Sequence, residues 1–361
     1  MGLRHGTGIV AVMSDRPGPD ARPAATDPSA PAADPSAPAA ALPLEPSSVE
    51  PFVPDVSIAP PPDPALEPQG FVVHADDGSR LHFLDWGGPD RAGSAADGAV
   101  LLVPGLLQPA WSWAPVARRL AAVRRTVVAD LRGHGLSDAP MDGYSVETLA
   151  ADAVAVAEGS GLLDHQPLVL AGHGFGAIVA AVAAARLGSA CAALVLVDGG
   201  WERLESTTGL DVDEFLRGLD EPPEVLQSMA AYLGDRRGFD PPTWDADQER
   251  AARDAVVETA AGRVVRVVRP HVVEAVVRTM FTWDPAEKLG MVRAPVFALV
   301  ALGAGDPAAT DLRLAELRRT ARARLAAGQS ALRVAGFPGI GHNLMRYRPA
   351  DVTAAILAPA G

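Results

Sequence analysis

The chain has 361 residues, 48% of them hydrophobic and 21% charged, which predicts a globular protein with a large buried core. Its net charge of −13 argues against a general binder of nucleic acids or anionic membranes, because both attract basic surfaces. A single cysteine, Cys191, excludes an internal disulfide framework and a zinc–cysteine site. No apolar run reaches the roughly 18 residues that a membrane span needs, and the apolar stretch at residues 8–13 is too short for a secretory signal. We therefore expect a cytoplasmic protein.

Residues 1–69 have the composition of a disordered tail. They contain sixteen of the 33 prolines, and the sequence of residues 27–33 is repeated at residues 34–40. Proline removes backbone donors and blocks helices, while Ala and Ser offer little surface to bury. We predict that this segment lies outside the folded domain, either as an inert extension or as a docking or solubilising arm.

From residue 70 onward the sequence alternates between strand and helix patterns. Two short strands joined by a turn are expected at residues 71–75 and 81–85. Continuous apolar runs, typical of strands buried on both faces of a parallel sheet, follow at residues 99–103, 126–129, 168–171, 193–197 and 296–301. Helical patterns lie between or after them at residues 114–122, 146–158, 177–187, 311–327 and 349–357. This alternation predicts an α/β fold with a mostly parallel twisted sheet and helices on both faces.

The alternation stops between residues 201 and 282. Charged amphipathic segments at residues 247–265 and 271–280 replace it. We expect a helical cap at 201–282, inserted after the sixth strand, and a core formed by 70–200 and 283–361. Ligands of open α/β sheets bind at the carboxyl ends of the strands, so the cap is expected to cover the site.

Six short motifs follow expected strand ends in chain order: PGLL at residues 104–107, DLRGHGLSD at 130–138, GHGFGA at 172–177, VDGG at 197–200, GAGDP at 303–307 and GIGHNL at 339–344. Together they resemble the motifs of the α/β-hydrolase superfamily, in the branch that contains capped esterases, lactonases, C–C hydrolases, epoxide hydrolases and cofactor-free lyases or oxygenases. The resemblance implies an α/β-hydrolase fold and a nucleophile on the sharp turn G-x-Ser-x-G.

The resemblance also implies roles for individual residues. His342 matches the base that takes the proton of the nucleophile, and Asp306 matches the acid that orients the base. Asp198, at the end of the sixth strand, is the alternative acid, ranked behind Asp306. The backbone N–H groups of Leu106 and Phe175 match the oxyanion hole.

Gly174 occupies the position of the nucleophile. Glycine has no side chain that can attack a substrate, so a covalent acyl-enzyme or alkyl-enzyme cannot form there. Losing the nucleophile of such a triad costs on the order of 10⁶ in turnover. Glycine also accepts the strained backbone of the turn without the roughly 1–3 kcal/mol that other residues lose.

Three interpretations remain open at this stage. The protein is an enzyme that needs only the base pair and the oxyanion hole, acting on a small, mostly apolar carbonyl compound. Alternatively, it is a catalytically inactive relative that binds a ligand or a partner. In the third interpretation, an engineered glycine replaces the serine of a serine hydrolase.

Other reactive side chains are expected to have structural roles. Cys191 precedes the sixth strand and is placed at the opposite edge of the sheet. Ser112 and Ser137 are expected to make local hydrogen bonds, and His173 to pack beneath the turn.

Aromatic residues suggest the kind of ligand. Trp111, Trp113 and Trp201 lie in loops expected near the pocket, and the cap offers Trp244, Met280, Phe281 and Trp283 as its roof. They favour a small, mostly apolar ligand, with Trp111, Trp113, Trp201 and Phe281 as substrate-binding residues. The histidines form no H-x-x-x-H pair and the glycine-rich turns lack the dinucleotide spacing, so we expect no metal and no organic cofactor. The sequence does not indicate an oligomeric state.

Overall fold

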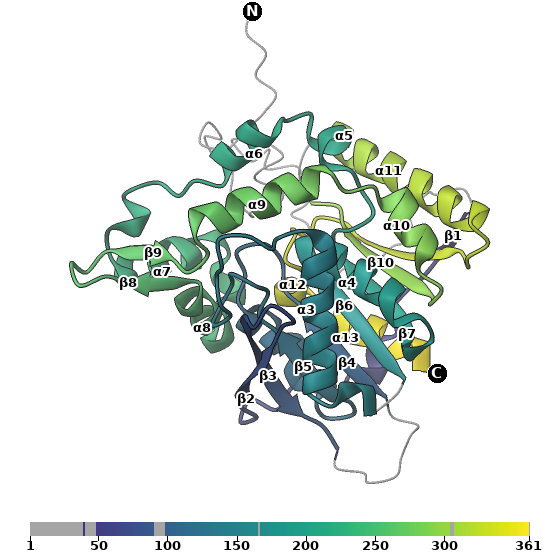
Figure 1. Ribbon diagram of the computed structural model, residues 1–361, viewed down its shortest axis with the longest axis horizontal. Helices are drawn as coiled ribbons and strands as arrows, with labels where there is room; N and C mark the ends of the chain where they lie inside the picture. Colours follow the sequence, from purple (N-terminus) through teal and green to yellow (C-terminus); the bar gives the residue numbers. More distant parts are fainter. Residues whose placement is uncertain (1–38, 40–47, 90–97, 165–166, 304–306, 361) are drawn as a thin grey trace, which may run out of the picture.

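The computed structural model describes residues 39, 48–89, 98–164, 167–303 and 307–360. Within them, one sheet contains nine strands in the order β1 (Val49–Pro51), β11 (Leu332–Phe337), β10 (Val296–Ala301), β7 (Cys191–Val197), β6 (Leu168–His173), β4 (Ala99–Val103), β5 (Arg125–Ala129), β3 (Arg80–Gly87) and β2 (Gln69–His74) (Figure 1). Neighbouring strands are parallel except where β3 pairs with β2 and with β5. The mostly parallel sheet expected from the apolar runs is confirmed.

Helices cover both faces of this sheet because the strands bury alternate side chains in two separate cores. On β4, Leu101 and Val103 belong to one apolar cluster, whereas Val100 and Leu102 belong to the other. The first cluster is completed by α3 (Val146–Gly159), α4 (Phe175–Leu187), α10 (Pro285–Met291) and α11 (Pro307–Ala326). The second is completed by α2 (Ala114–Leu120), α12 (Leu344–Tyr347) and α13 (Pro349–Leu357).

The segment from residue 48 to residue 69 belongs to the fold, so the prediction of a disordered tail is wrong there. Strand β1 pairs in parallel with β11 at one edge of the sheet, and the Phe52 N–H donates to the Val334 carbonyl at 2.8 Å. The Phe52 ring packs edge-on against Phe297 with centroids 5.1 Å apart. A short edge strand tolerates the proline at position 51, which explains why the composition concealed it. Residues 1–38 and 40–47 of the expected tail lie outside the described residues.

The insertion between β7 and β10 contains α5 (Leu204–Thr208), α6 (Val212–Gly218), α7 (Met229–Phe239), α8 (Ala246–Asp254), β8 (Val256–Glu258), β9 (Val264–Arg266) and α9 (Pro270–Phe281). In Figure 1, α6 to α9 and the β8–β9 hairpin gather across the upper left of the view. The hairpin corrects the expectation of an entirely helical cap. Val256 and Val264 are buried whereas Val257 and Val265 are exposed, which is the alternation of a half-buried ribbon, and Gly262 provides the turn at φ 76°.

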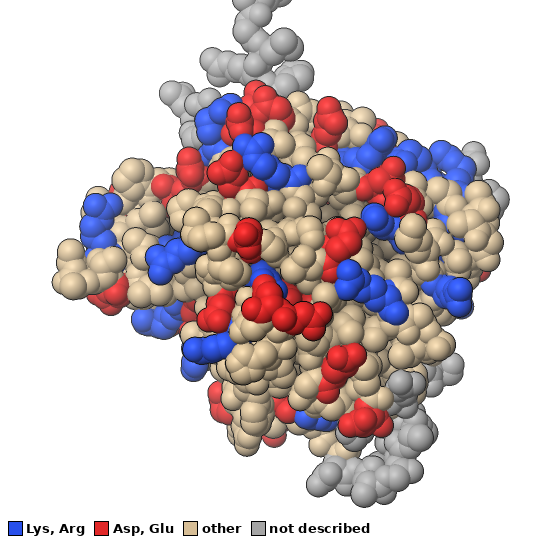
Figure 2. Space-filling model, viewed as in Figure 1, with Lys and Arg blue, Asp and Glu red and all other residues tan. Residues whose placement is uncertain are grey.

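The surface in the view of Figure 2 carries acidic and basic side chains that are interspersed over the exposed helices. Across the described ranges, no helix combines the length and the apolar character that crossing a bilayer requires.

Candidate active site

The turn between β6 and α4 places Gly174 at the carboxyl edge of the sheet. Its φ of 52° lies in the left-handed region that favours glycine. The flanking glycines allow a close approach, because a Cβ on Gly172 would lie 2.2 Å from the carbonyl oxygen of Gly176. The turn therefore has the tight strand-to-helix geometry expected from the GHGFGA motif.

His342 faces this turn from the loop that follows β11. A Cβ added to Gly174 would lie 3.2 Å from His342 Nε2 and 3.4 Å from its Cε1, and apart from Gly174 and its two chain neighbours no other described residue comes within 4 Å of that point. The imidazole is 7% exposed. The structure thus brings the expected base to the expected turn, with only a small space between Nε2 and the glycine Cα.

Asp198 is the carboxylate that holds His342 in the described part of the chain. Its Oδ2 lies 2.6 Å from His342 Nδ1, and its side chain is fully buried. The sequence ranked Asp306 ahead of Asp198 for this role. Asp306 lies outside the described residues, and the observed contact favours Asp198.

Arg313 on α11 stabilises the charge of Asp198. Its Nη2 donates to Asp198 Oδ1 at 3.0 Å, and the Ala301 N–H donates to the same oxygen at 2.9 Å. Burial alone would raise the pKa of Asp198, but the charge of Arg313 and the hydrogen bond with His342 outweigh it and lower the pKa to about 2. Asp198 is therefore a carboxylate throughout the neutral range and can stabilise a protonated imidazole.

Two backbone N–H groups are the candidates for an oxyanion site. Phe175 is the first residue of α4, so its N–H has no acceptor within the helix. Leu106 lies in the loop after β4, and its N–H makes no backbone hydrogen bond within the described ranges. The next residue, Leu107, has φ 66°, which is uncommon for a side chain of this size. Both Leu106 and Phe175 line the cavity that also contains His342.

A hydrogen-bonded network ties these loops together beneath the turn. His173 Nδ1 lies 2.9 Å from Gln108 Oε1, and its Nε2 lies 3.1 Å from the His342 carbonyl oxygen. Gln108 accepts from the Gly105 N–H at 3.0 Å and donates to Asn343 Oδ1 at 2.7 Å. Burial, reinforced by the neighbouring imidazole, holds the pKa of His173 well below its usual value. His173 is therefore a neutral imidazole that connects the loop of Gln108 to the loop of His342.

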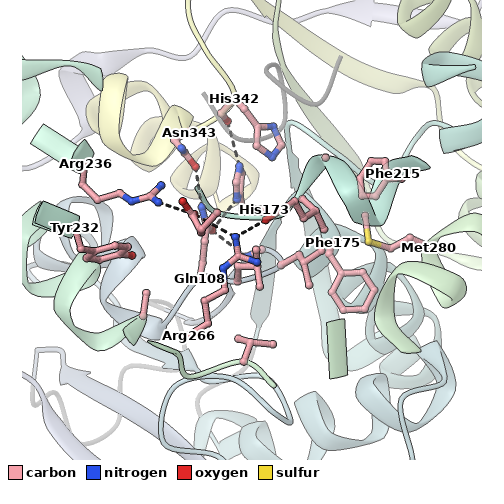
Figure 3. Close-up of a pocket in the computed structure, with 18 residues that line it drawn as sticks. Gln108, His173, Phe175, Phe215, Tyr232, Arg236, Arg266, Met280, His342 and Asn343 are labelled. Atoms are coloured by element: carbon pink, nitrogen blue, oxygen red, sulfur yellow. Dashed lines mark hydrogen bonds and ion pairs between the residues drawn. The ribbon is translucent and has the colours of Figure 1, made fainter. Parts of the chain in front are cut away.

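A cavity of about 200 Å³ opens in front of His342 (Figure 3). The core side of its wall consists of residues 105–108, His173, Phe175, His342 and Asn343. The insertion supplies the opposite wall, with Phe215, Gly218, Leu219, Glu221, Tyr232, Arg236, Ala255, Arg266, Val268 and Met280. The cavity is therefore mixed: apolar around Phe175, Phe215 and Met280, and charged where Arg236 and Arg266 converge.

The four aromatic residues expected to bind substrate do not line this cavity. Trp113 and Trp201 are fully buried in the core. The Trp111 ring packs edge-on against Trp86, and Phe281 packs in the same way against Phe215. Burial of large aromatic rings lowers the free energy of the folded chain, which explains why these side chains pack against the protein and not along the cavity. Of the suggested roof residues, Met280 lines the cavity.

The other candidate nucleophiles have different surroundings. Cys191 begins β7, at the opposite end of the strand from Asp198, and burial raises the pKa of its thiol to about 12. Ser137 Oγ donates to the Asp130 carbonyl at 2.9 Å. Ser112 Oγ is buried with no partner among the described residues, so the local hydrogen bond expected for it is not found. In the described ranges, no cluster of three or more His, Cys, Asp or Glu side chains has metal-binding geometry.

Comparison with known proteins agrees with this fold. Residues 98–262 match the family model of the alpha/beta hydrolase fold, and the structure resembles that of E-2-(acetamidomethylene)succinate hydrolase with a TM-score of 0.62, 21% identity and coverage of 80% of this chain and 98% of that one. The chain has the α/β-hydrolase fold.

The curated relatives match only part of this chain. N-formylmaleamate deformylase of Pseudomonas putida is 40% identical over 122 residues, which are 34% of this chain and 42% of the relative. Mouse epoxide hydrolase 4 is 32% identical over 120 residues, 33% of this chain and 31% of the relative. The matching segment therefore spans less than half the length of either relative. A thioesterase domain from the curacin biosynthetic pathway shares the fold at a TM-score of 0.57, with 22% identity and coverage of 80% of this chain and 99% of that one.

Several residues of this candidate site could not be predicted from the sequence. Arg313 lies within a predicted helix whose pattern did not indicate that it reaches Asp198. Arg236, Arg266 and Glu221 come from three separate elements of the insertion, and no motif joins them. Among these residues, Asn343 is the one that the sequence could have indicated, because it directly follows His342 in the GIGHNL motif.

Proposed function

We propose that this α/β-hydrolase hydrolyses a small carbonyl compound by general-base catalysis, without a covalent intermediate. The observation that carries the proposal is the position of His342: its Nε2 faces Gly174, which has no nucleophile, while its Nδ1 is held by the ionised Asp198. A scaffold without catalytic function has no chemical need for this pair.

In the proposed reaction, His342 Nε2 takes a proton from a water molecule as the water oxygen bonds to the substrate carbonyl carbon. The carbonyl π electrons move to oxygen, where the N–H groups of Leu106 and Phe175 stabilise the negative charge. Asp198 stabilises the imidazolium. When the tetrahedral intermediate collapses, the bond to the leaving group breaks and the leaving group receives the proton from His342. Atoms and charge balance with water as the only co-substrate.

The relatives support a hydrolytic reaction. The epoxide hydrolase is named for a hydrolytic reaction and the deformylase for the removal of a formyl group, although each matches this chain over a limited segment. The apolar part of the cavity, around Phe175, Phe215 and Met280, suits the body of a small organic substrate. The reaction proposed here needs no metal and no organic cofactor, and a cytoplasmic location remains part of the proposal.

The experiment compares the purified chain with His342→Ala and Gly174→Ser on four probes: a nitrophenyl ester, a lactone, an epoxide and a nitrobenzisoxazole, whose ring opens when a base removes its C–H proton. We expect His342→Ala to abolish turnover of at least one ester or lactone and of the nitrobenzisoxazole, while the wild-type chain forms no acyl-enzyme detectable by mass spectrometry. His74→Ala, on the exposed strand β2, is the matched control.

Two outcomes contradict the proposal. If His342→Ala has the same rates as the wild-type chain, then His342 is not the base. If the wild-type chain turns over none of the probes but Gly174→Ser creates esterase activity, the glycine protein is a non-catalytic relative whose site retains hydrolase geometry.

A further inference from the structure

The insertion places two arginines and one glutamate in the wall of the cavity opposite His342. Glu221 Oε1 lies 2.5 Å from Arg236 Nη2 and 3.1 Å from Arg266 Nη2. In Figure 3 the two guanidinium groups converge from different elements, α7 and β9. Among the side chains that line this part of the cavity, two cations share one carboxylate, so the lining has an excess of one positive charge.

Several contacts hold the guanidinium of Arg236 in the wall of the cavity. Its guanidinium lies over the Tyr232 ring at 4.8 Å, and its Nη2 also lies 3.6 Å from Asp235, which is not part of the wall. Its Nε is buried with no hydrogen-bond partner among the described residues, so the guanidinium has donor capacity that these residues do not use.

A second cavity of about 180 Å³ adjoins the first and is also cationic. The two share Leu107, Gln108, Arg236, Ala255 and Asn343 in their walls. The second cavity adds Arg346, and no Asp or Glu is among the described residues that line it. The molecule as a whole has a net charge of −13 and a surface on which both signs are mixed (Figure 2), so the excess of arginine in these two cavities is a local feature.

We propose that the substrate of this site carries one free carboxylate. This carboxylate binds to Arg236 and Arg266, while a separate carbonyl group of the substrate, the one that reacts, lies at His342. This inference deepens the proposed function by naming the substrate class, and it rests on that function for the reaction but not for the binding. The Arg346 side of the second cavity provides a cationic approach to Arg236, which favours the entry of an anion.

The chemistry of the wall favours a carboxylate over a phosphate. A planar guanidinium presents paired N–H donors that match the two oxygens of a carboxylate. One net positive charge neutralises a monoanion, whereas a phosphate dianion would leave excess negative charge next to Glu221. Glu221 acts as the internal counter-ion that occupies the arginines when no ligand is present.

This role of Glu221 distinguishes a carboxylate-binding cluster from an ion pair that only stabilises the insertion. Arg236→Gln removes a donor and a charge, so it should weaken carboxylate binding by about tenfold or more. Glu221→Gln removes the competing carboxylate, so it should tighten binding severalfold. If the cluster served only to hold the insertion together, both substitutions would have the same sign.

The measurement is isothermal titration calorimetry of the full chain with acetate, butyrate and benzoate, and with benzamide, phosphate and sulfate as comparison ligands. We expect carboxylates to bind, benzamide not to bind, and phosphate and sulfate to bind more weakly. Arg253→Gln is the matched control, since Arg253 is an insertion arginine that pairs with Glu249 at 2.7 Å and lines neither cavity. It should leave the affinities unchanged.

Thermal unfolding with and without benzoate keeps the test interpretable if a variant is destabilised. A variant that binds is stabilised by an amount that increases with the logarithm of its affinity, whatever its own melting temperature. The proposal is overturned if no carboxylate binds the wild-type chain, if phosphate binds more tightly than every carboxylate, or if Arg236→Gln and Arg253→Gln behave alike.

The same titrations separate this inference from the proposed function. His342→Ala should retain carboxylate binding even though it loses turnover. If His342→Ala proves to be as active as the wild-type chain while Arg236→Gln weakens binding, the substrate class stands and the base mechanism fails. If the reverse holds, the mechanism stands without a carboxylate subsite.

Discussion

The Nδ1 atom of His342 lies 2.6 Å from Oδ2 of Asp198, and the other oxygen of this carboxylate accepts hydrogen bonds from Arg313 and from the Ala301 backbone. The imidazole is thus fixed through one carboxylate to strand β10 and helix α11. Because Asp198 itself has φ 46° at the end of β7, its side chain is aimed by an uncommon backbone conformation.

We expect Asp198→Asn to lower base-catalysed turnover by about 10³–10⁴-fold, because an amide can hold the wrong imidazole tautomer and cannot stabilise its protonated form. Asp306→Asn should change turnover far less. The measurement is the rate of nitrobenzisoxazole opening, together with the NMR signal of the His342 Nδ1 proton, which should be lost in Asp198→Asn only. A larger loss in Asp306→Asn than in Asp198→Asn would return the orienting role to Asp306.

Most of the fold could be predicted because its signals are local. The run at residues 99–103 is apolar throughout since β4 is buried on both faces, and the motif at residues 172–177 marks the turn of Gly174 through its glycines. The short strand β1 could not be predicted in the same way. It has three residues, one of them proline, and its stability comes from pairing with β11, which is distant in the sequence.

The residues of the candidate site also fall into those with a local sequence signal and those without one. Gly174 and His342 could be located because each follows a strand in a recognisable motif. The choice between Asp198 and Asp306 depends on a distance between two loops, and the sequence contains no such distance. The charged wall of Arg236, Arg266 and Glu221 arises only from the way the insertion folds, so the sequence suggested a mostly apolar ligand.

Two buried histidines should make the protein less stable in mild acid. Burial lowers the pKa of His173 and of His134 in the folded state. Below their usual value of 6.5 the unfolded chain binds protons that the folded chain does not, so the free energy of unfolding falls as the pH decreases. Each histidine contributes at most about 1.4 kcal/mol per pH unit.

The check is denaturant unfolding at a series of pH values from about 7.5 to about 5. His173→Asn and His134→Asn should each reduce the slope of unfolding free energy against pH, and the two effects should add. His74→Asn, which changes an exposed residue, should leave the slope unchanged. Parallel slopes for all four proteins would show that neither buried histidine is linked to folding.

We expect Gly174→Ser to lower the stability of the protein and to add a nucleophile to the site. The left-handed backbone at φ 52° costs a non-glycine residue about 1–3 kcal/mol, and the new Cβ would lie 3.2 Å from His342 Nε2, so the ring must shift by a few tenths of an ångström. The serine hydroxyl would then lie beside the base and could be activated by it. We expect lower unfolding free energy together with covalent labelling by a fluorophosphonate, which the wild-type chain should not show.

Gly174→Ala separates the two effects. It should lose as much stability as Gly174→Ser but remain unlabelled, and Gly174→Ser combined with His342→Ala should also remain unlabelled. Labelling of the wild-type chain would reveal a different nucleophile and would remove the reason for a non-covalent mechanism.

Arg118 on α2 should connect the N-terminal segment and the insertion to the core. Its side chain is 7% exposed, and its Nη2 lies 3.0 Å from both Glu67 and Asp247. The guanidinium also lies over the Trp86 ring at 5.0 Å. Arg118→Met keeps the apolar stem but leaves Asp247, which is largely buried, without its cation. Removal of one partner of a buried ion pair costs about 3–5 kcal/mol.

Glu67 is 62% exposed, so Glu67→Gln should cost far less than Arg118→Met. Calorimetric melting should rank the variants in this order, and limited proteolysis should cleave residues 52–67 faster in Arg118→Met than in the wild-type chain. Equal melting temperatures for the two variants would show that the segment is held by β1 and Phe52 alone.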